Sequence, residues 1–158
     1  QSAKRSIACR ILDRLNIPYN VHEYDWDEEA LDAKTAAQKV GIASSQIFKT
    51  LVLRGDKTGV LMTCIPGDRE LDLKALASIS GNKKVEMVHV KDLQTLTGYI
   101  RGGVSPLGVK KKYPLYIDET VHALDPVSIS AGRRGLQIFL KGADLVLACE
   151  ATLGAISR

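Results

Sequence analysis

The segment of this sequence whose residue types are best suited to chemistry is a glycine-rich loop around position 103. Gly102 and Gly103 lack a Cβ, so the backbone there can take positive φ values and approach a ligand closely. Pro106 fixes its own φ and restricts Ser105 before it, which shapes the loop in advance. Successive N–H groups in such a loop can form an anion site or an oxyanion hole. A solvated turn has the same composition, so the loop alone leaves both interpretations open.

A run of lysines directly follows this loop. Lys110, Lys111 and Lys112 are consecutive, and no acidic residue falls between Arg101 and Lys112. A cationic run beside a pre-shaped loop suits a phosphate-bearing ligand whose carbonyl group must be polarised. The Gly-x-x-x-x-Gly-Lys-Ser/Thr spacing is absent, which excludes a phosphate-loop NTPase. An ordinary basic surface strand remains the alternative.

Lys49 is a second cation with a candidate chemical role. It follows Phe48 at the start of an otherwise apolar segment, where an inward-facing lysine is uncommon. Facing outward, it would be an ordinary strand lysine. Facing a cleft, its ammonium group could hold a ribose-phosphate or orient a carbonyl.

The conventional catalytic and metal-binding patterns are absent. Neither Gly-x-Ser-x-Gly nor His-Glu-x-x-His occurs, and the three histidines have no catalytic spacing. Cys9, Cys64 and Cys149 are odd in number, far apart and within apolar segments. We therefore expect small core cysteines in a reducing cytoplasm, with no disulfide framework, no metal site and no cofactor.

The composition is that of one ordinary globular domain over residues 1–158. Hydrophobic residues make up 45% and charged residues 25%, and no apolar run approaches the roughly 18 residues that would cross a bilayer. The charged N-terminal segment does not resemble a signal peptide. A net charge of +4 permits a nucleic-acid partner without requiring one.

Hydrophobic periodicity predicts helices interleaved irregularly with strands. Expected helices cover residues 7–15, 33–40, 73–79, 92–97 and 144–149. Expected strands cover residues 19–24, 48–54, 60–65, 85–88, 115–117, 127–129 and 136–140, with a hairpin between the second and third. This order favours an α/β (α+β) fold with a mixed, largely antiparallel sheet over a doubly wound parallel sheet.

Five motifs, taken together, resemble those of a known family. They are Phe48-Lys49-Thr50-Leu51, Lys83-Lys84-Val85-Glu86-Met87, Thr97-Gly98-Tyr99, Gly102-Gly103-Val104-Ser105-Pro106-Leu107-Gly108 and Ser130-Ala131-Gly132-Arg133-Arg134-Gly135-Leu136. In this order they resemble the bacterial YbaK/EbsC family, free-standing deacylases of Cys-tRNA(Pro). The same fold is the editing insertion of bacterial prolyl-tRNA synthetases. The resemblance covers nearly the whole chain.

The resemblance implies a mixed β-sheet, partly closed like a barrel and surrounded by helices. It implies hydrolysis of the ester that joins a wrong amino acid to the terminal adenosine of a tRNA. A synthetase pocket shaped for one amino acid rejects similar or smaller ones by only about 1–3 kcal/mol, so a second site must destroy the wrong product. The family mechanism has no side-chain nucleophile, because the substrate's own cysteine thiol attacks its ester.

The resemblance also assigns roles to residues. Lys49, Gly102 and Gly103 are the expected catalytic positions, with Lys49 holding the adenosine and ester and the loop amides binding the carbonyl. The expected substrate-binding residues are Tyr24, Thr50, Val104, Ser105, Pro106, Ser130 and Gln137. Lys110, Lys111 and Lys112 are expected to contact the tRNA. The implied partners are the 3′ acceptor end of an aminoacyl-tRNA and prolyl-tRNA synthetase, with no membrane partner.

One departure keeps the amino-acid specificity open. Many Cys-type members carry an acid where this chain has Gln137, so a carboxylate contact with the substrate's ammonium group is lacking. The His-Pro-Leu segment of alanine-specific relatives is also absent, which favours cysteine. Two alternatives remain, a deacylase for alanine or serine on tRNA and a non-catalytic module that binds tRNA or a synthetase.

Overall fold

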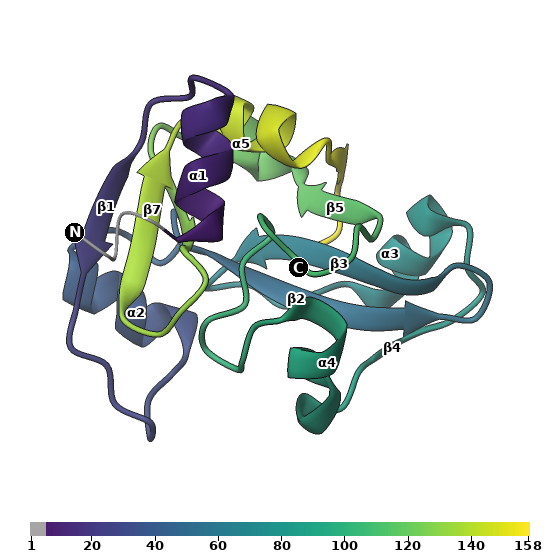
Figure 1. Ribbon diagram of the computed structural model, residues 1–158. Coiled ribbons are helices and arrows are strands. Elements are labelled where there is room, and N and C mark those ends of the chain that lie inside the picture. Colours follow the sequence, from purple (N-terminus) through teal and green to yellow (C-terminus); the bar gives the residue numbers. More distant parts are fainter. Residues whose placement is uncertain (1–5) are drawn as a thin grey trace.

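Two β-sheets form the centre of the molecule, with helices packed against them (Figure 1). The computed structural model describes residues 6–158, so the first five residues of the charged N-terminal segment lie outside the description. The helices are α1 (Ile7–Arg14), α2 (Ala33–Val40), α3 (Leu73–Ser80), α4 (Leu93–Thr97) and α5 (Gly142–Cys149), with 3₁₀ turns η2 (Val90–Asp92) and η3 (Glu119–Ala123). None of the helices in this described part has the length and apolarity needed to cross a membrane.

Local capping sets the ends of α2 and α3. The side chains of Asp32 and Asp72 each accept a hydrogen bond from the N–H three residues ahead, at 3.1 and 3.0 Å. Gly41 and Gly81 end the two helices with φ values of +81° and +80°, which a residue without a Cβ adopts most easily. The predicted helices over 33–40 and 73–79 are confirmed to within one residue.

The strands form one antiparallel and one mixed sheet. The three-stranded sheet has the order β1 (Asn20–Glu23), β7 (Leu136–Leu140), β6 (Val127–Ser130), and both of its pairings are antiparallel. The five-stranded sheet has the order β4 (Val85–Met87), β2 (Phe48–Gly55), β3 (Gly59–Pro66), β5 (Leu115–Asp118), β8 (Thr152–Gly154). Among the strand pairs of residues 6–158, β3–β5 and β5–β8 are parallel and the others antiparallel. The predicted mixed, largely antiparallel sheet is confirmed, while β8 was not expected.

The two sheets meet along one edge of β2 and then separate. At the start of β2, Ile47 bridges Ser128 of β6, whose N–H donates to the Gln46 carbonyl at 2.8 Å. At the other end, the same edge pairs with β4, and the Val88 N–H donates to the Val52 carbonyl at 3.1 Å. Between these two contacts no described strand covers the edge. The junction therefore leaves an opening beside residues 49–51 of β2.

In a β-strand, the backbone N–H and C=O groups of successive residues point to opposite edges, and this determines which groups face the opening. The carbonyls of Gln46 and Val52 both point to the open edge, since they accept from β6 and from the residue after β4. Backbone groups of every second residue point the same way, so the N–H and C=O of Thr50 also face the opening. They are available to a ligand lying there.

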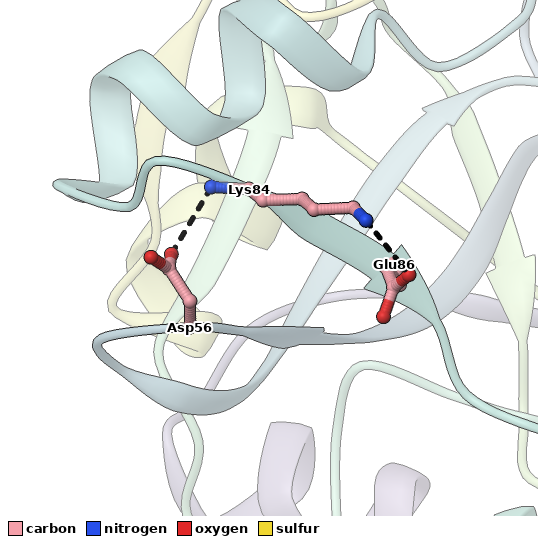
Figure 2. A network of polar contacts seen from close by, with 3 residues as sticks. All are labelled: Asp56, Lys84 and Glu86. Carbon is pink, nitrogen blue, oxygen red and sulfur yellow. Dashed lines mark hydrogen bonds and ion pairs between the residues drawn. The ribbon is translucent and has the colours of Figure 1, made fainter.

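A fixed turn supports the far end of the β2–β3 hairpin (Figure 2). The Asp56 carboxylate accepts hydrogen bonds from the N–H groups of Lys83 and Lys84 at 2.9 and 3.0 Å. The backbone hydrogen bond from Lys84 and then that from Lys83 hold the pKa of Asp56 below its ordinary value. Lys84 also lies 3.4 Å from Glu86 in an exposed ion pair. The carboxylate thus ties the start of β4 to the hairpin turn.

The main hydrophobic core spans both sheets and the helices α1 and α5. Ala8, Cys9 and Leu12 form the buried face of α1, and Leu145 of α5 is fully buried in the same cluster. Cys64 of β3 also belongs to it, whereas Cys149 is partly exposed. The prediction of core cysteines is therefore confirmed for Cys9 and Cys64. All three thiols are free.

Candidate functional site

A cavity of about 410 Å³ lies at the opening between the two sheets. It is lined by β2 on one side and, on the others, by α2 and the residues before it, by the stretch from the end of β4 to the start of α4, by the loop after α4 and by residues of β6 and β7. The predicted positions that line it are Tyr24, Lys49, Thr50, Gly102, Val104, Ser130 and Gln137. Residues far apart in the sequence thus meet at one cavity. Their roles there stay predictions.

Lys49 lines the cavity and is half-buried, so it is not an ordinary surface lysine. Burial is the largest influence on its pKa and lowers it from the ordinary 10.5, and Glu70 opposes that effect more weakly. The ion pairs found among residues 6–158 do not include Lys49. A partly desolvated ammonium group without a paired carboxylate is suited to binding an anion or a polarised oxygen.

Gly102 is the third residue of a tight turn that closes with a 2.9 Å hydrogen bond from the Gly103 N–H to the Ile100 carbonyl. Its φ of +87° is the value that favours glycine at this position of a type II turn. A Cβ on Gly102 would lie 3.2 Å from the side chain of Leu31, which also lines the cavity. The chain therefore needs glycine here for both conformation and space.

The turn changes which amides can serve as oxyanion donors. The Gly103 N–H already donates to Ile100, so the expectation that it binds the substrate carbonyl does not agree with this conformation. Gly103 instead allows a close approach, since a Cβ there would lie 2.9 Å from the Arg133 backbone. Neither Gly102 nor Val104 has a hydrogen-bond acceptor for its N–H among residues 6–158. Both residues line the cavity, so their amides are candidate donors beside the N–H of Thr50 at the open edge of β2.

Ser105 and Pro106 do not line the cavity, contrary to their predicted role as substrate contacts. Ser105 is fully buried, and its Oγ accepts a hydrogen bond from the Leu107 N–H at 3.3 Å. Pro106 is buried beside a separate hollow that Ile11 also lines. Both residues lie on the buried side of the loop and help to hold its shape.

Ser130 and Gln137 face each other across β6 and β7 and form a neutral polar part of the cavity wall. Gln137 is nearly buried, and its Oε1 accepts a 2.6 Å hydrogen bond from the Ser128 hydroxyl. This leaves the Nε2 hydrogens of Gln137 for another partner. The Ser130 hydroxyl accepts from the Gly132 N–H at 3.1 Å. The wall therefore offers hydrogen bonds without a charge.

Tyr24 joins the cavity to a neighbouring groove. Its N–H donates to the Gly135 carbonyl at 2.9 Å, which extends the pairing of β1 with β7 by one residue. The side chain lines the cavity and also the groove that continues along residues 25–26. The two depressions thus share one wall.

The thiols and imidazoles lie outside the cavity wall. Burial raises the pKa of the Cys64 thiol to about 12, and burial also raises that of Cys149. Neither can supply a thiolate near neutral pH. None of the histidines lines the cavity, and His22 stacks on Phe139 with ring centres 4.0 Å apart. Within residues 6–158 no group of three metal-ligating side chains occurs.

The lysine run lies outside the cavity. Lys110, Lys111 and Lys112 are exposed, and Lys112 pairs with Glu150. The hydrogen bond from Lys112 is the largest of the effects that lower the pKa of Glu150. The contact of Lys110, Lys111 and Lys112 with tRNA stays a prediction.

Sequence reasoning missed several cavity residues. Leu31 is a single apolar residue inside an acidic stretch, and that contrast was the available signal. Arg101 lines the cavity next to Gly102, at the start of the stretch without acidic residues that ends at Lys112. Met87 and Val90 line the cavity and remain 51% and 61% exposed, so they form an apolar rim. Only the fold brings them beside β2.

Comparison with known proteins places the chain in a class that edits aminoacyl-tRNA. Residues 27–147 match the aminoacyl-tRNA editing domain family, and the chain belongs to that family. EbsC of Enterococcus faecalis, named as a candidate Cys-tRNA(Pro)/Cys-tRNA(Cys) deacylase, is 48% identical over 140 residues, covering 89% of this chain and 85% of EbsC. The resemblance found in the sequence motifs is confirmed.

Two further relatives are a solved structure with the same fold and a larger enzyme that matches this chain over part of its length. A crystal structure of a candidate trans-editing enzyme for prolyl-tRNA synthetase superposes with a TM-score of 0.85 at 26% identity, covering 99% of this chain and 97% of that one. The proline–tRNA ligase of Shouchella clausii is 28% identical over 107 residues, covering 68% of this chain and 19% of the ligase. The chain therefore corresponds to one part of the larger ligase.

Proposed function

We propose that this protein hydrolyses the ester of Cys-tRNA(Pro), so removing cysteine wrongly attached to a proline tRNA. The observation that carries the proposal is the cavity at the sheet junction, which is lined both by the unpaired, partly desolvated Lys49 of β2 and by Gly102 and Val104, whose N–H groups have no acceptor among residues 6–158. A volume of about 410 Å³ lies within the usual range of roughly 300–1,000 Å³ for small-ligand sites. The similarity to EbsC supports the choice of substrate.

The proposed chemistry uses the substrate's own thiol as the nucleophile. The cysteinyl sulfur attacks the ester carbonyl carbon, and the carbonyl oxygen becomes an oxyanion to which the Gly102 and Val104 amides donate. The carbon–oxygen bond to the ribose then breaks, and the ribose oxygen takes the proton that the thiol lost. Water opens the resulting cyclic thioester to free cysteine. The protein binds and orients, and it supplies no nucleophile of its own.

Each remaining cavity group has a binding role in this proposal. Lys49 holds the terminal adenosine and the ester. Thr50 offers backbone hydrogen bonds at the open edge of β2, and Tyr24 closes the side next to the groove. Ser130 and Gln137 surround the small amino-acid side chain.

The proposed partner is prolyl-tRNA synthetase, acting before this enzyme on the same tRNA. A pocket for proline discriminates weakly against cysteine, because small differences in apolar contact are worth only about 1–3 kcal/mol. The similarity to part of a proline–tRNA ligase supports this pairing. We place the reaction in the cytoplasm, where tRNAs are charged.

A panel of mischarged tRNAs tests the proposal. Purified protein is incubated with Cys-, Ala-, Ser- and Pro-tRNA(Pro), and release of each amino acid is followed over time. We expect fast release of cysteine and none of proline. Preferential release of alanine or serine would reassign the substrate. The neutral Gln137 side chain is compatible with that result. No release above the buffer rate would leave a non-catalytic binding module.

A further inference from the structure

A second depression, a groove of about 1040 Å³, lies directly beside the cavity. One wall is formed by residues 23–26 and the other by Ile100 and residues 133–136, and the two walls meet where Glu23 pairs with Leu136 and Tyr24 with Gly135. Tyr24 lines both depressions, and Arg134 donates from Nε to the Arg101 carbonyl at 2.9 Å. Because Arg101 lines the cavity, the groove continues from the cavity mouth.

Trp26 is the aromatic feature of this groove and the only tryptophan of the chain. Its side chain is held in place against Gly135, where a Cβ would lie 2.6 Å from the indole Cδ1. The guanidinium carbon of Arg134 lies 5.2 Å from the ring centre, within cation–π range. Trp26 nevertheless remains 47% exposed. A fixed, half-exposed indole beside a cationic group is a stacking platform.

The charge of the groove differs between its two walls. Arg133 and Arg134 stand on one wall with Arg101 next to them, and none of the three belongs to an ion pair within residues 6–158. Glu23 and Asp25 stand on the other wall. A chain of phosphates would therefore follow the arginine wall and keep away from the acidic one. Its bases would then lie toward the exposed part of the Trp26 indole, beside Arg134.

We propose that this groove binds the unpaired nucleotides that precede the terminal adenosine of the tRNA. The proposal rests on the proposed function, since an adenosine held in the cavity requires its preceding nucleotides to leave through the mouth. Guanidinium groups for phosphates and an exposed aromatic ring for a base are the two elements of single-strand recognition. Stacking of this kind tolerates any base, so the contact would strengthen binding without selecting the tRNA.

Fluorescence of the single tryptophan tests the contact without any need for catalysis. An uncharged RNA oligonucleotide ending in CCA is titrated into the protein at low and at moderate salt. We expect saturable quenching of the Trp26 emission, with weaker binding at the higher salt. Absence of quenching at saturating RNA would overturn the proposal. Quenching by prolyl-tRNA synthetase in place of RNA would likewise overturn it and identify a protein-docking surface.

Variants test the two walls with the same oligonucleotide carrying a fluorescent label. Trp26→Ala and Arg133→Ala should each weaken binding about tenfold, whereas Trp26→Phe should retain most of it. Lys57→Ala is the matched control, because Lys57 is an exposed cation on the β2–β3 turn that lines neither depression. Melting curves show that each variant is folded. Equal affinities for all four variants and the wild type would contradict the assignment.

Substrates of two lengths separate this proposal from the proposed function. Trp26→Ala should lower kcat/KM about tenfold for Cys-tRNA(Pro) and leave it unchanged for cysteine esterified to adenosine alone. An equal loss with both substrates would place Trp26 in the cavity and overturn the groove assignment. If the wild type hydrolyses neither substrate, the proposed function fails, and the RNA titration still decides whether the groove binds a single strand.

Discussion

Lys49 occupies a position that disfavours its own positive charge, which is typical of a residue kept for binding. Its lowered pKa means that the folded protein holds this proton less tightly than the unfolded chain does. The charge therefore reduces stability at neutral pH, and the loss is recovered only as the pH rises through the lowered value toward 10.5. Replacing the ammonium group should help the fold and harm the reaction.

Lys49→Met separates these two effects. We expect deacylation to fall at least about tenfold, roughly 1.4 kcal/mol of transition-state stabilisation, while the melting temperature stays equal or rises. Single-turnover rates and thermal melts at neutral pH provide the measurement, with Lys57→Ala as a control on the exposed turn. Full activity in Lys49→Met would remove the lysine from the mechanism.

The protein's thiols should be dispensable. Because burial raises the pKa of Cys64 to about 12, Cys64→Ala should leave the deacylation rate nearly unchanged. Ser-tRNA(Pro) should react much more slowly than Cys-tRNA(Pro), since a hydroxyl is far less ionised and less nucleophilic than a thiol. Both rates are measured under single turnover. A large rate loss in a folded Cys64→Ala variant would place a protein thiol in the reaction.

At the scale of the element, the glycine loop combines the tight turn at Gly102 with the proposed hydrogen-bond donors to the oxyanion. Gly102→Ala should lower turnover about 10²-fold, on the scale of one oxyanion-hole donor, because the Cβ would press on Leu31 and disturb the turn. Gly41→Ala is the matched control. Gly41 has nearly the same φ, +81°, and a Cβ there has nothing within 4 Å. Both variants place a Cβ at a left-handed φ, so Gly41→Ala shows what that backbone strain alone does to turnover. An equal loss of turnover in both would contradict a local role for Gly102.

The sequence predicted elements whose boundaries are set by neighbouring residues. Asp32 and Gly41 cap α2, and the turn around Gly59 joins a hairpin, so local chemistry determines these ranges. It did not predict β8, whose parallel pairing with β5 depends on residues far apart in the chain. The same limit applies within the site. The hydrogen bond from Gly103 to Ile100 and the burial of Ser105 depend on backbone geometry and packing that residue types do not reveal.

At the scale of the whole molecule, Asp118 ties β5 to the turn η3 and to the end of the chain. It accepts hydrogen bonds from the Ile156 N–H at 3.2 Å, the Ser157 hydroxyl at 2.8 Å and the Thr120 hydroxyl at 2.7 Å. Burial is the largest single effect and raises the pKa of Asp118, but the hydrogen bonds from Thr120, Ser157 and Ile156 together outweigh it. The pKa lies below its ordinary 3.8.

Stability should therefore depend on Asp118 in a pH-specific way. A lowered folded pKa stabilises the protein fully above the ordinary value, and the effect is lost as the pH falls through the folded value. Asp118→Asn should be less stable than the wild type by about 1–3 kcal/mol at pH 7, with a smaller difference near pH 3. Urea unfolding at both pH values measures this, with exposed Glu119→Gln as the control. A difference that is constant with pH would contradict the assignment.

The lysine run should act on the tRNA as a whole and not on the ester. Lys111 is exposed and lines no part of the cavity, whereas Lys112 is already paired with Glu150. Lys111→Ala should therefore weaken tRNA binding and reduce the salt slope by about one phosphate contact, with a smaller effect in Lys112→Ala. Binding is measured at several salt concentrations, and single-turnover rates at saturating tRNA should stay near the wild-type value. Lys111 lies outside the cavity, so the lysine run and the glycine loop should act separately. A loss of rate at saturation as large as that of Gly102→Ala would contradict this and show that the two form one catalytic unit.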